Sequence, residues 1–264
     1  MSDIINERSG NILRIQFNRP EKKNAMTSSM YITLANLLND AAKDDSVSVV
    51  LLHSSGNSFS AGNDVQDFLK HPPGPGESPQ AQLMKALVNF DKPIVVAVQG
   101  AAVGGGATML PHCDFVYAGE SAKFQTPFIN LGLVPEFGSS YSIPARIGHL
   151  RAAELILLGQ PVNAQRAAEL GLVTSVVPDE KLLEIATETA RKLTEKPIGA
   201  LRASKRLLKR FSRGPVEQAI EAENEEFAVR VRGPEATEAF TAFLEKRAPN
   251  FAKIKEAATV PGLF

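Results

Sequence analysis

Residues 99–108 carry their chemistry in the backbone rather than in side chains. They follow residues 93–98, a short apolar run rich in β-branched residues that is typical of a buried strand. Three consecutive glycines at 104–106 leave backbone N–H groups uncovered and let a ligand approach closely. Residues 107–110 then predict the start of a buried helix. Strand, glycine turn and helix N-terminus together form a set of donors that favours negative charge. The alternative is a tight turn packed under a helix.

A second strand-to-loop unit echoes this one. Residues 49–52 lead to a glycine-bearing loop that contains Asn63, as residues 94–97 lead to the loop that contains Gly105. If the two units pack side by side in one sheet, both loops lie at the same edge and two N–H groups converge. Two converging donors stabilise a carbonyl that becomes an enolate or a tetrahedral adduct. Losing one donor of such a pair costs ~3–4 kcal/mol of barrier.

Glu136 is the carboxylate with the most unusual surroundings, because residues 133–135 and 137 around it are apolar. Poor solvation raises the pKa of a carboxyl group, which suits a general base near neutral pH. Alternatively, Glu136 precedes a predicted helix over 139–147 and interacts with its dipole. Asp64 follows Asn63 and is predicted to cap a short helix over 65–70.

The sequence offers no evident nucleophile. It contains no Gly-x-Ser-x-Gly elbow. His53, His71, His112 and His149 are interpreted as ordinary surface or capping histidines. A thiol–base pair of His112 with Cys113 is disfavoured, because sequence neighbours seldom face each other.

Composition narrows the class of protein. The chain has 264 residues, 44% of them hydrophobic and 22% charged, with a formal net charge of zero, so nothing in the bulk charge suggests nucleic acid. A single cysteine excludes an internal disulfide and a Cys-rich metal site, and no metal is expected. The N-terminus lacks a signal-peptide core and no run is long enough to span a bilayer. We expect a cytoplasmic protein, although targeting tags can be short.

Strands are predicted in the first half of the chain and helices dominate the second, which favours an α/β core with a helical C-terminal part. The connection over 123–140 shows little regular pattern. The predicted strands are 11–17, 47–53, 93–98 and 115–118. The predicted helices are 28–43, 65–70, 82–90, 139–147, 151–158, 163–170, 180–194, 197–209, 216–230 and 235–246.

Four ordered motifs, at 18–26, 59–64, 100–106 and 163–173, make nearly the whole chain resemble the crotonase (enoyl-CoA hydratase/isomerase) superfamily. The resemblance implies an α/β fold of the ClpP/crotonase-like type, a spiral of ββα units over 1–196 with a helical trimerisation region over 197–264. It implies homotrimers or hexamers (dimers of trimers) and acyl-CoA thioesters as ligands, with no cofactor besides that CoA. The oxyanion hole would be the N–H groups of Asn63 and Gly105.

Departures from the hydratase pattern bear on the reaction. Hydratases of this superfamily carry a glutamate two residues after the glycine triplet, where this chain has Thr108, and another in a Pro-Glu pair, where it has Pro127-Phe128. Neither Thr108 nor Phe128 can activate water or supply a proton. Glu136 stands where peroxisomal-type Δ3,Δ2-enoyl-CoA isomerases place a single catalytic glutamate. The resemblance therefore implies an isomerase of fatty-acid β-oxidation.

The resemblance also implies substrate contacts. Lys22 and Lys23, with the main chain near Ala25 and Ala61, would approach the CoA nucleotide. Phe251 and Lys253 are weaker candidates for the same contact. Two alternatives stay open: a hydratase or other crotonase reaction that uses Glu136, and an inactive acyl-CoA-binding homologue. The implied substrate-binding residues are Lys22, Lys23, Ala25, Ala61, Asp64, Val65, Gly104, Phe128, Leu131 and Pro135.

Overall fold

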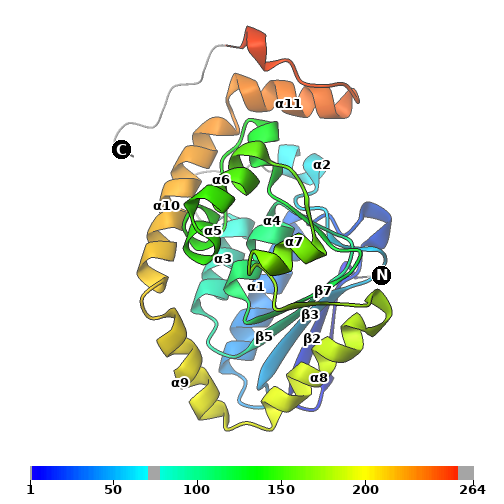
Figure 1. Ribbon diagram of the computed structural model, residues 1–264, viewed down its shortest axis with the longest axis vertical. Helices are drawn as coiled ribbons and strands as arrows, with labels where there is room; N and C mark the ends of the chain where they lie inside the picture. Colours follow the sequence, from blue (N-terminus) through cyan, green and yellow to red (C-terminus); the bar gives the residue numbers. More distant parts are fainter. Residues whose placement is uncertain (1, 71–77, 255–264) are drawn as a thin grey trace.

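The computed structural model describes residues 2–70 and 78–254 (Figure 1). His71 and the loop 71–77 lie outside the described residues. A six-stranded sheet forms the centre of the fold, in the order β1-β2-β3-β5-β7-β10. Only the β1–β2 pair is antiparallel. The strands are β1 (Ile4–Ser9), β2 (Ile12–Phe17), β3 (Val49–Ser54), β5 (Ile94–Val98), β7 (Phe115–Gly119) and β10 (Ser175–Val177).

Both faces of this sheet are buried, which explains why its central strands are continuously apolar. Val50 and Val96 belong to the core under α1 (Ser28–Lys43) and α3 (Pro79–Asn89). Their sequence neighbours Leu51 and Val95 point to the opposite face, against α8 (Leu182–Thr194). The strand β1 was not predicted, because five of its six residues are exposed and it shows no apolar alternation.

A second, four-stranded sheet was also missed, and it corrects two expectations. Residues 101–103, interpreted as part of a turn, form a strand of this sheet, and the segment 123–140 contains another strand and the 3₁₀ helix η3 (Pro127–Leu131). Each strand has only two or three residues, too few for a periodic pattern. The order is β4 (Ser58–Ser60), β6 (Ala101–Val103), β8 (Lys123–Gln125), β9 (Val162–Asn163).

Gly100 makes the corner between the two sheets. Its φ is 56°, and a Cβ there would lie 1.9 Å from the carbonyl oxygen of Asn57, so only glycine fits. The strand pairs β3–β5 and β4–β6 are both parallel. The two strand-to-loop units therefore lie side by side, an arrangement that the internal echo allowed, but they extend over two sheets rather than one.

The predicted helices are present, with ends that differ by a few residues. In Figure 1, α9 and α10 run along one edge of the molecule and α11 crosses at its end. None of the helices in the described ranges is long and apolar enough to cross a membrane. The division of the chain at residue 196 stays a prediction. The later helices are α5 (Ser139–Ile147), α6 (His149–Leu158), α7 (Ala164–Glu169), α9 (Ile198–Lys209), α10 (Arg213–Arg230) and α11 (Pro234–Leu244).

Candidate active site

Asn63 lies just beyond β4, where its own backbone N–H is left free. Met26 forms a parallel bridge with it: the N–H of Met26 donates to the carbonyl of Gly62 (2.7 Å), and the N–H of Asp64 donates to the carbonyl of Met26 (2.9 Å). This pattern uses the neighbours of Asn63, so the N–H of Asn63 points the other way. Within residues 2–70 and 78–254 it has no acceptor. The Tyr31 hydroxyl donates to Oδ1 of Asn63 (2.7 Å).

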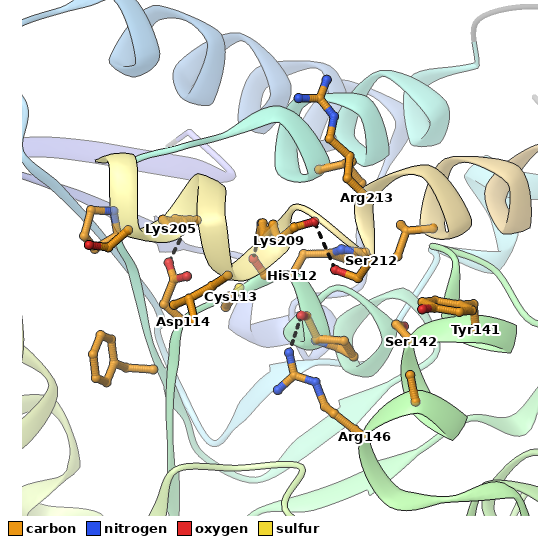
Figure 2. A pocket seen from close by; sticks show the side chains of 18 of the residues that line it. His112, Cys113, Asp114, Tyr141, Ser142, Arg146, Lys205, Lys209, Ser212 and Arg213 are labelled. Carbon is orange, nitrogen blue, oxygen red and sulfur yellow. Dashed lines mark hydrogen bonds and ion pairs between the residues drawn. The ribbon is translucent and has the colours of Figure 1, made fainter. Parts of the chain in front are cut away.

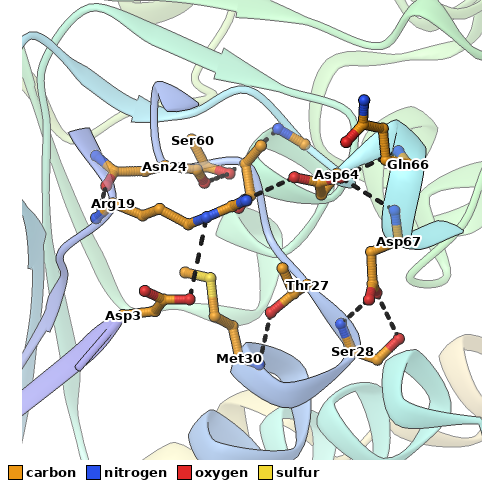
Figure 3. A network of polar contacts seen from close by, with 12 residues as sticks. Asp3, Arg19, Asn24, Thr27, Ser28, Met30, Ser60, Asp64, Gln66 and Asp67 are labelled. Atoms are coloured by element: carbon orange, nitrogen blue, oxygen red, sulfur yellow. Dashed lines mark hydrogen bonds and ion pairs between the residues drawn. The ribbon is translucent and has the colours of Figure 1, made fainter. Parts of the chain in front are cut away.

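An ion pair fixes this loop from outside (Figure 3). Nη1 of Arg19 donates to Oδ2 of Asp64 (2.7 Å) and to the carbonyl of Ala25 (2.9 Å). The other carboxylate oxygen, Oδ1, accepts the N–H groups of Gln66 and Asp67 (3.0 Å each). Asp64 therefore caps α2 (Val65–Lys70), as predicted. Asp64 was predicted both as a helix cap and as a substrate-binding residue, and the contacts above belong to the capping role.

Gly105 supplies the second free donor. Gly104 has φ 53° and ψ −124°, a conformation open to glycine, and its carbonyl accepts the N–H groups of Ala107 and Thr108. Gly105 is thus the first residue of α4 (Gly105–Thr108), and the first N–H groups of a helix have no partner within it. The two loops touch, since a Cβ on Gly62 would lie 2.9 Å from the carbonyl oxygen of Val103.

Glu136 lies beside Gly105 in a buried position. It is 5% exposed, and its Oε1 lies 3.1 Å from the point that a Cβ on Gly105 would occupy. In the described part of the chain, Oε1 has no hydrogen-bond partner. Burial raises the pKa of Glu136 to about 8, and the charge of Glu223 adds to the rise. The carboxyl group thus has the raised pKa that the sequence predicted for a poorly solvated acid.

Two buried side chains hold the backbone that follows Glu136. Phe137 and Gly138 are both left-handed (φ 63° and 67°). Nε2 of His112 lies 2.6 Å from the carbonyl oxygen of Phe137. The Glu223 carboxylate, on α10, accepts the N–H of Gly138 (2.6 Å) and of Ser140 (2.7 Å).

His112 corrects one interpretation, because it is buried rather than a surface histidine. Burial lowers its pKa to about 4, and since a carbonyl can only accept, Nε2 carries the hydrogen that Phe137 receives. Burial also raises the pKa of Cys113 to about 12, so its thiol stays protonated. The pair that the sequence disfavoured is therefore inert as a nucleophile.

One wall of the site is apolar. Phe128 lies beside the glycines, with Cε1 3.9 Å from the position of a Cβ on Gly104. The hydroxyl of Thr108 donates to the carbonyl of Gly104 (3.1 Å) and is buried. Two other predicted contacts, Val65 and Leu131, pack against the same cluster as Phe128. Its buried members are Phe68, Phe128, Leu133, Phe227, Ala236 and Phe240.

The residues predicted to approach the CoA nucleotide lie together but more openly. Lys22 and Lys23 are exposed, and the carbonyl of Lys23 accepts the N–H of Ala61 (2.9 Å). Pro135, next to Glu136, is partly buried. Phe251 belongs to a separate 3₁₀ helix near the described end of the chain, and the side chain of Lys253 lies outside what the structure describes.

Sequence reasoning missed Tyr31, Arg19 and Glu223. Arg19 was named only as part of the motif at 18–26, without a role of its own, and Tyr31 was given no role in the predicted helix over 28–43. Glu223 did leave a signal: on α10 it takes a place in the stripe of residues 216, 220, 223 and 227, whose other members are apolar. A carboxylate at a core position of a helix needs a buried partner.

A cavity of about 550 Å³ lies elsewhere, between α5, α9, α10 and residues 111–115 (Figure 2). It is rich in cations, but they hold the core together. Nζ of Lys205 bonds Asp114 (2.7 Å) and the carbonyl of Lys92 (2.7 Å), and Lys209 bonds the carbonyl of His112 (3.2 Å). None of Asn63, Gly105 and Glu136 lines it. We interpret these contacts as docking α9 onto the core.

Comparison with known proteins places the chain in a family. The family model for enoyl-CoA hydratase/isomerase matches residues 7–254, so the chain belongs to this family, and the crotonase resemblance is confirmed. It is 32% identical to 2,3-dehydroadipyl-CoA hydratase of Escherichia coli K12, over 95% of this chain and 99% of that protein. It is 35% identical to human enoyl-CoA delta isomerase 2, over 89% of this chain and 61% of that protein.

A solved structure has the same fold. The enoyl-CoA hydratase/isomerase from Pseudoalteromonas atlantica T6c superposes with a TM-score of 0.90 at 37% identity, covering 95% of this chain and 100% of that one. The predicted α/β crotonase fold is thus confirmed. Relatives at similar identity carry both hydratase and isomerase names, so similarity defines the family of this chain but not its reaction.

Proposed function

We propose that this protein is a Δ3,Δ2-enoyl-CoA isomerase acting in fatty-acid β-oxidation. The observation that carries the proposal is Glu136, a buried carboxyl group with a free oxygen directed at Gly105. Thr108 and Phe128 occupy the two positions at which, by the family resemblance, hydratases carry their glutamates. A single acid suffices to move one proton, whereas hydration needs groups to orient water and to supply a proton.

In the proposed reaction Glu136 acts twice. Its carboxylate removes a proton from C2 of a 3-enoyl-CoA, and the electron pair delocalises over C2, C4 and the thioester oxygen. The same carboxyl group then returns the proton to C4, and the double bond comes to lie between C2 and C3. The reaction is redox-neutral, and CoA enters as part of the substrate. A base with a pKa of about 8 is well matched to this exchange near neutral pH.

The N–H groups of Asn63 and Gly105 are proposed to hold the dienolate oxygen. Both are backbone donors fixed by strands and a helix start, so they need little reorganisation as charge develops. The apolar cluster around Phe128 is proposed to receive the acyl chain, and Lys22 and Lys23 the CoA phosphates. The cytoplasmic location and the homotrimeric or hexameric assembly are part of the proposal.

The decisive assay offers the purified protein 3-hexenoyl-CoA and 2-hexenoyl-CoA side by side. We expect conversion of the 3-enoyl to the 2-enoyl thioester, with little addition of water. Glu136→Gln keeps the size and polarity of the side chain but cannot carry the proton. It should lower kcat by about 10²–10⁴-fold, toward the upper end because Glu136 serves both half-steps. Glu225→Gln, at an exposed position of α10, is the control and should keep full activity.

Two results would contradict the proposal: a folded Glu136→Gln protein that isomerises normally, or a wild type that hydrates 2-hexenoyl-CoA efficiently. The second would favour a hydratase, the reaction for which the E. coli relative is named. If neither thioester reacts while acyl-CoA still binds, the chain is a catalytically inactive acyl-CoA-binding homologue.

A further inference from the structure

We propose that Glu223 is a positioning residue for Glu136: its carboxylate holds the left-handed turn that aims the Glu136 carboxyl group at Gly105. Glu223 lies on α10, 87 residues further along the chain than Glu136 (223 − 136), and belongs to none of the motifs that mark the family here. The tests of this proposal that measure activity rest on the proposed isomerase function, whereas those that measure structure do not.

The geometry of the contact supports a specific role. Oε2 accepts the N–H of Gly138 (2.6 Å) and Oε1 accepts the N–H of Ser140 (2.7 Å), so one carboxylate spans three residues of backbone. These N–H groups lie at the N-terminus of α5, where they have no partner within the helix and a negative charge is favoured. Gly138 also fits tightly against α10, since a Cβ there would lie 3.1 Å from Val216.

The turn needs such support because its conformation is unfavourable. Phe137 has φ 63°, a left-handed conformation that is rare for a bulky residue and persists only where surrounding contacts determine it. His112 holds the carbonyl of Phe137 from one side, and Glu223 holds the next N–H groups from the other. Glu136 immediately precedes this clamped segment, so a shift of the turn moves its carboxyl group relative to Asn63 and Gly105.

Glu223 also acts on the charge state of Glu136. The titratable groups that face Glu136 are Tyr31 from α1, Glu223 from α10 and, through Phe137, His112 before β7. Tyr31 and His112 are neutral near pH 7, because burial raises the pKa of the first and lowers that of the second. Burial raises the pKa of Glu223 as well, but its two N–H bonds favour the ionised form. The charge of Glu223 raises the pKa of Glu136 and so opposes ionisation of that group.

Two substitutions separate position from charge. Glu223→Gln keeps the shape but removes the charge and places an amide NH₂ against a backbone N–H. We expect kcat to fall roughly 10- to 10²-fold, as for small misplacements of catalytic groups, with KM little changed. The pH at which kcat reaches half its maximum should move down. Glu223→Asp keeps the charge but is one methylene short: kcat should fall while that midpoint stays in place. Glu225→Gln should change neither.

Measurements without substrate test the same proposal if the isomerase function is wrong. Infrared difference titration reports the Glu136 carboxyl band, assigned by its loss in Glu136→Gln, and amide hydrogen exchange reports the 133–145 backbone. We expect a lower Glu136 midpoint in Glu223→Gln and faster exchange of the turn in both Glu223 variants. If Glu223→Gln fails to fold, Glu223→Asp decides on kcat and exchange. Folded Glu223 variants with wild-type kcat, midpoint and exchange would overturn the proposal, whereas an absent wild-type isomerase activity would overturn only the proposed function.

Discussion

Glu136 costs the protein stability in order to be a base. Its carboxyl group is taken out of water without a hydrogen-bond partner for Oε1 in the described chain, and the charge of Glu223 adds to the rise of its pKa. A polar group in this state is unfavourable for folding and persists where function needs it. The residue that carries the proposed chemistry should therefore be one whose removal stabilises the fold.

Glu136→Gln should raise the stability of the protein above pH 4.5. Folding raises the pKa of Glu136 from 4.5 to about 8, so the free energy of unfolding is highest below pH 4.5 and falls as pH rises toward 8. At pH 7 the loss of unfolding free energy is roughly 3 kcal/mol, at 1.36 kcal/mol per pH unit. Thermal melts at pH 5 and pH 8 test this: the advantage of the variant should be larger at pH 8. An equal advantage at both would mean that Glu136 does not titrate as described.

Gly105→Ala should impair catalysis although the backbone donor is kept. The new Cβ would lie 2.8 Å from the Tyr31 hydroxyl and 3.1 Å from Oε1 of Glu136, so one of these groups must move. We expect kcat to fall about 10²-fold, with the circular dichroism spectrum unchanged. Gly199→Ala is the matched control, since nothing lies within 4 Å of its Cβ; it should keep full activity and gain ~0.5–1 kcal/mol as a helix position.

At the residue scale the sequence identified Glu136 because its neighbours in the chain are apolar. It did not identify Tyr31 or Glu223, because what makes them important is a contact with a residue far away in sequence. Glu223 stands among several glutamates of 217–226, and only its place on the buried stripe of α10 distinguishes it.

At the scale of elements, long periodic helices were predicted well and short strands poorly. α1 begins at Ser28, as predicted, and its cap is Thr27, whose hydroxyl accepts the N–H of Met30. β4, β6 and β8 have three residues each, and pairing across the second sheet fixes them rather than local propensity. Yet these short strands bring the two loops into contact, an arrangement that the sequence pattern allowed although it gave no sign of the second sheet.

Asp64→Ala should loosen the start of α2 and the Asn63 loop together. It removes the cap of α2 and the partly buried ion pair with Arg19 (2.7 Å). We expect a loss of ~1–2 kcal/mol in urea denaturation, typical of a lost cap, and a lower kcat because the Asn63 N–H is less firmly held. Asp40→Ala, at an exposed position of α1, should leave both unchanged. A variant with wild-type stability would show that the network in Figure 3 does not hold this loop.

For the molecule as a whole, one surface is not that of a typical monomer. Leu208 and Phe211 are each 83% exposed at the junction of α9 and α10, and Leu207 beside them is also exposed. Exposed apolar clusters of this kind mark interaction sites. The family resemblance predicts a trimerisation region in this part of the chain, and the exposed side chains are what such an interface would bury.

The assembly prediction can be tested at this junction. Wild-type protein at micromolar concentration should sediment as a trimer or hexamer of the 28.4 kDa chain. Replacing both Leu208 and Phe211 with Glu places carboxylates where apolar contact is expected, and the mass should fall because burying an unpaired charge is unfavourable. Lys196→Glu, at an exposed site just before α9, controls for the added charge and should leave the mass unchanged. A stable wild-type monomer would contradict the assembly. A double variant that keeps the wild-type mass would instead place the interface on another face.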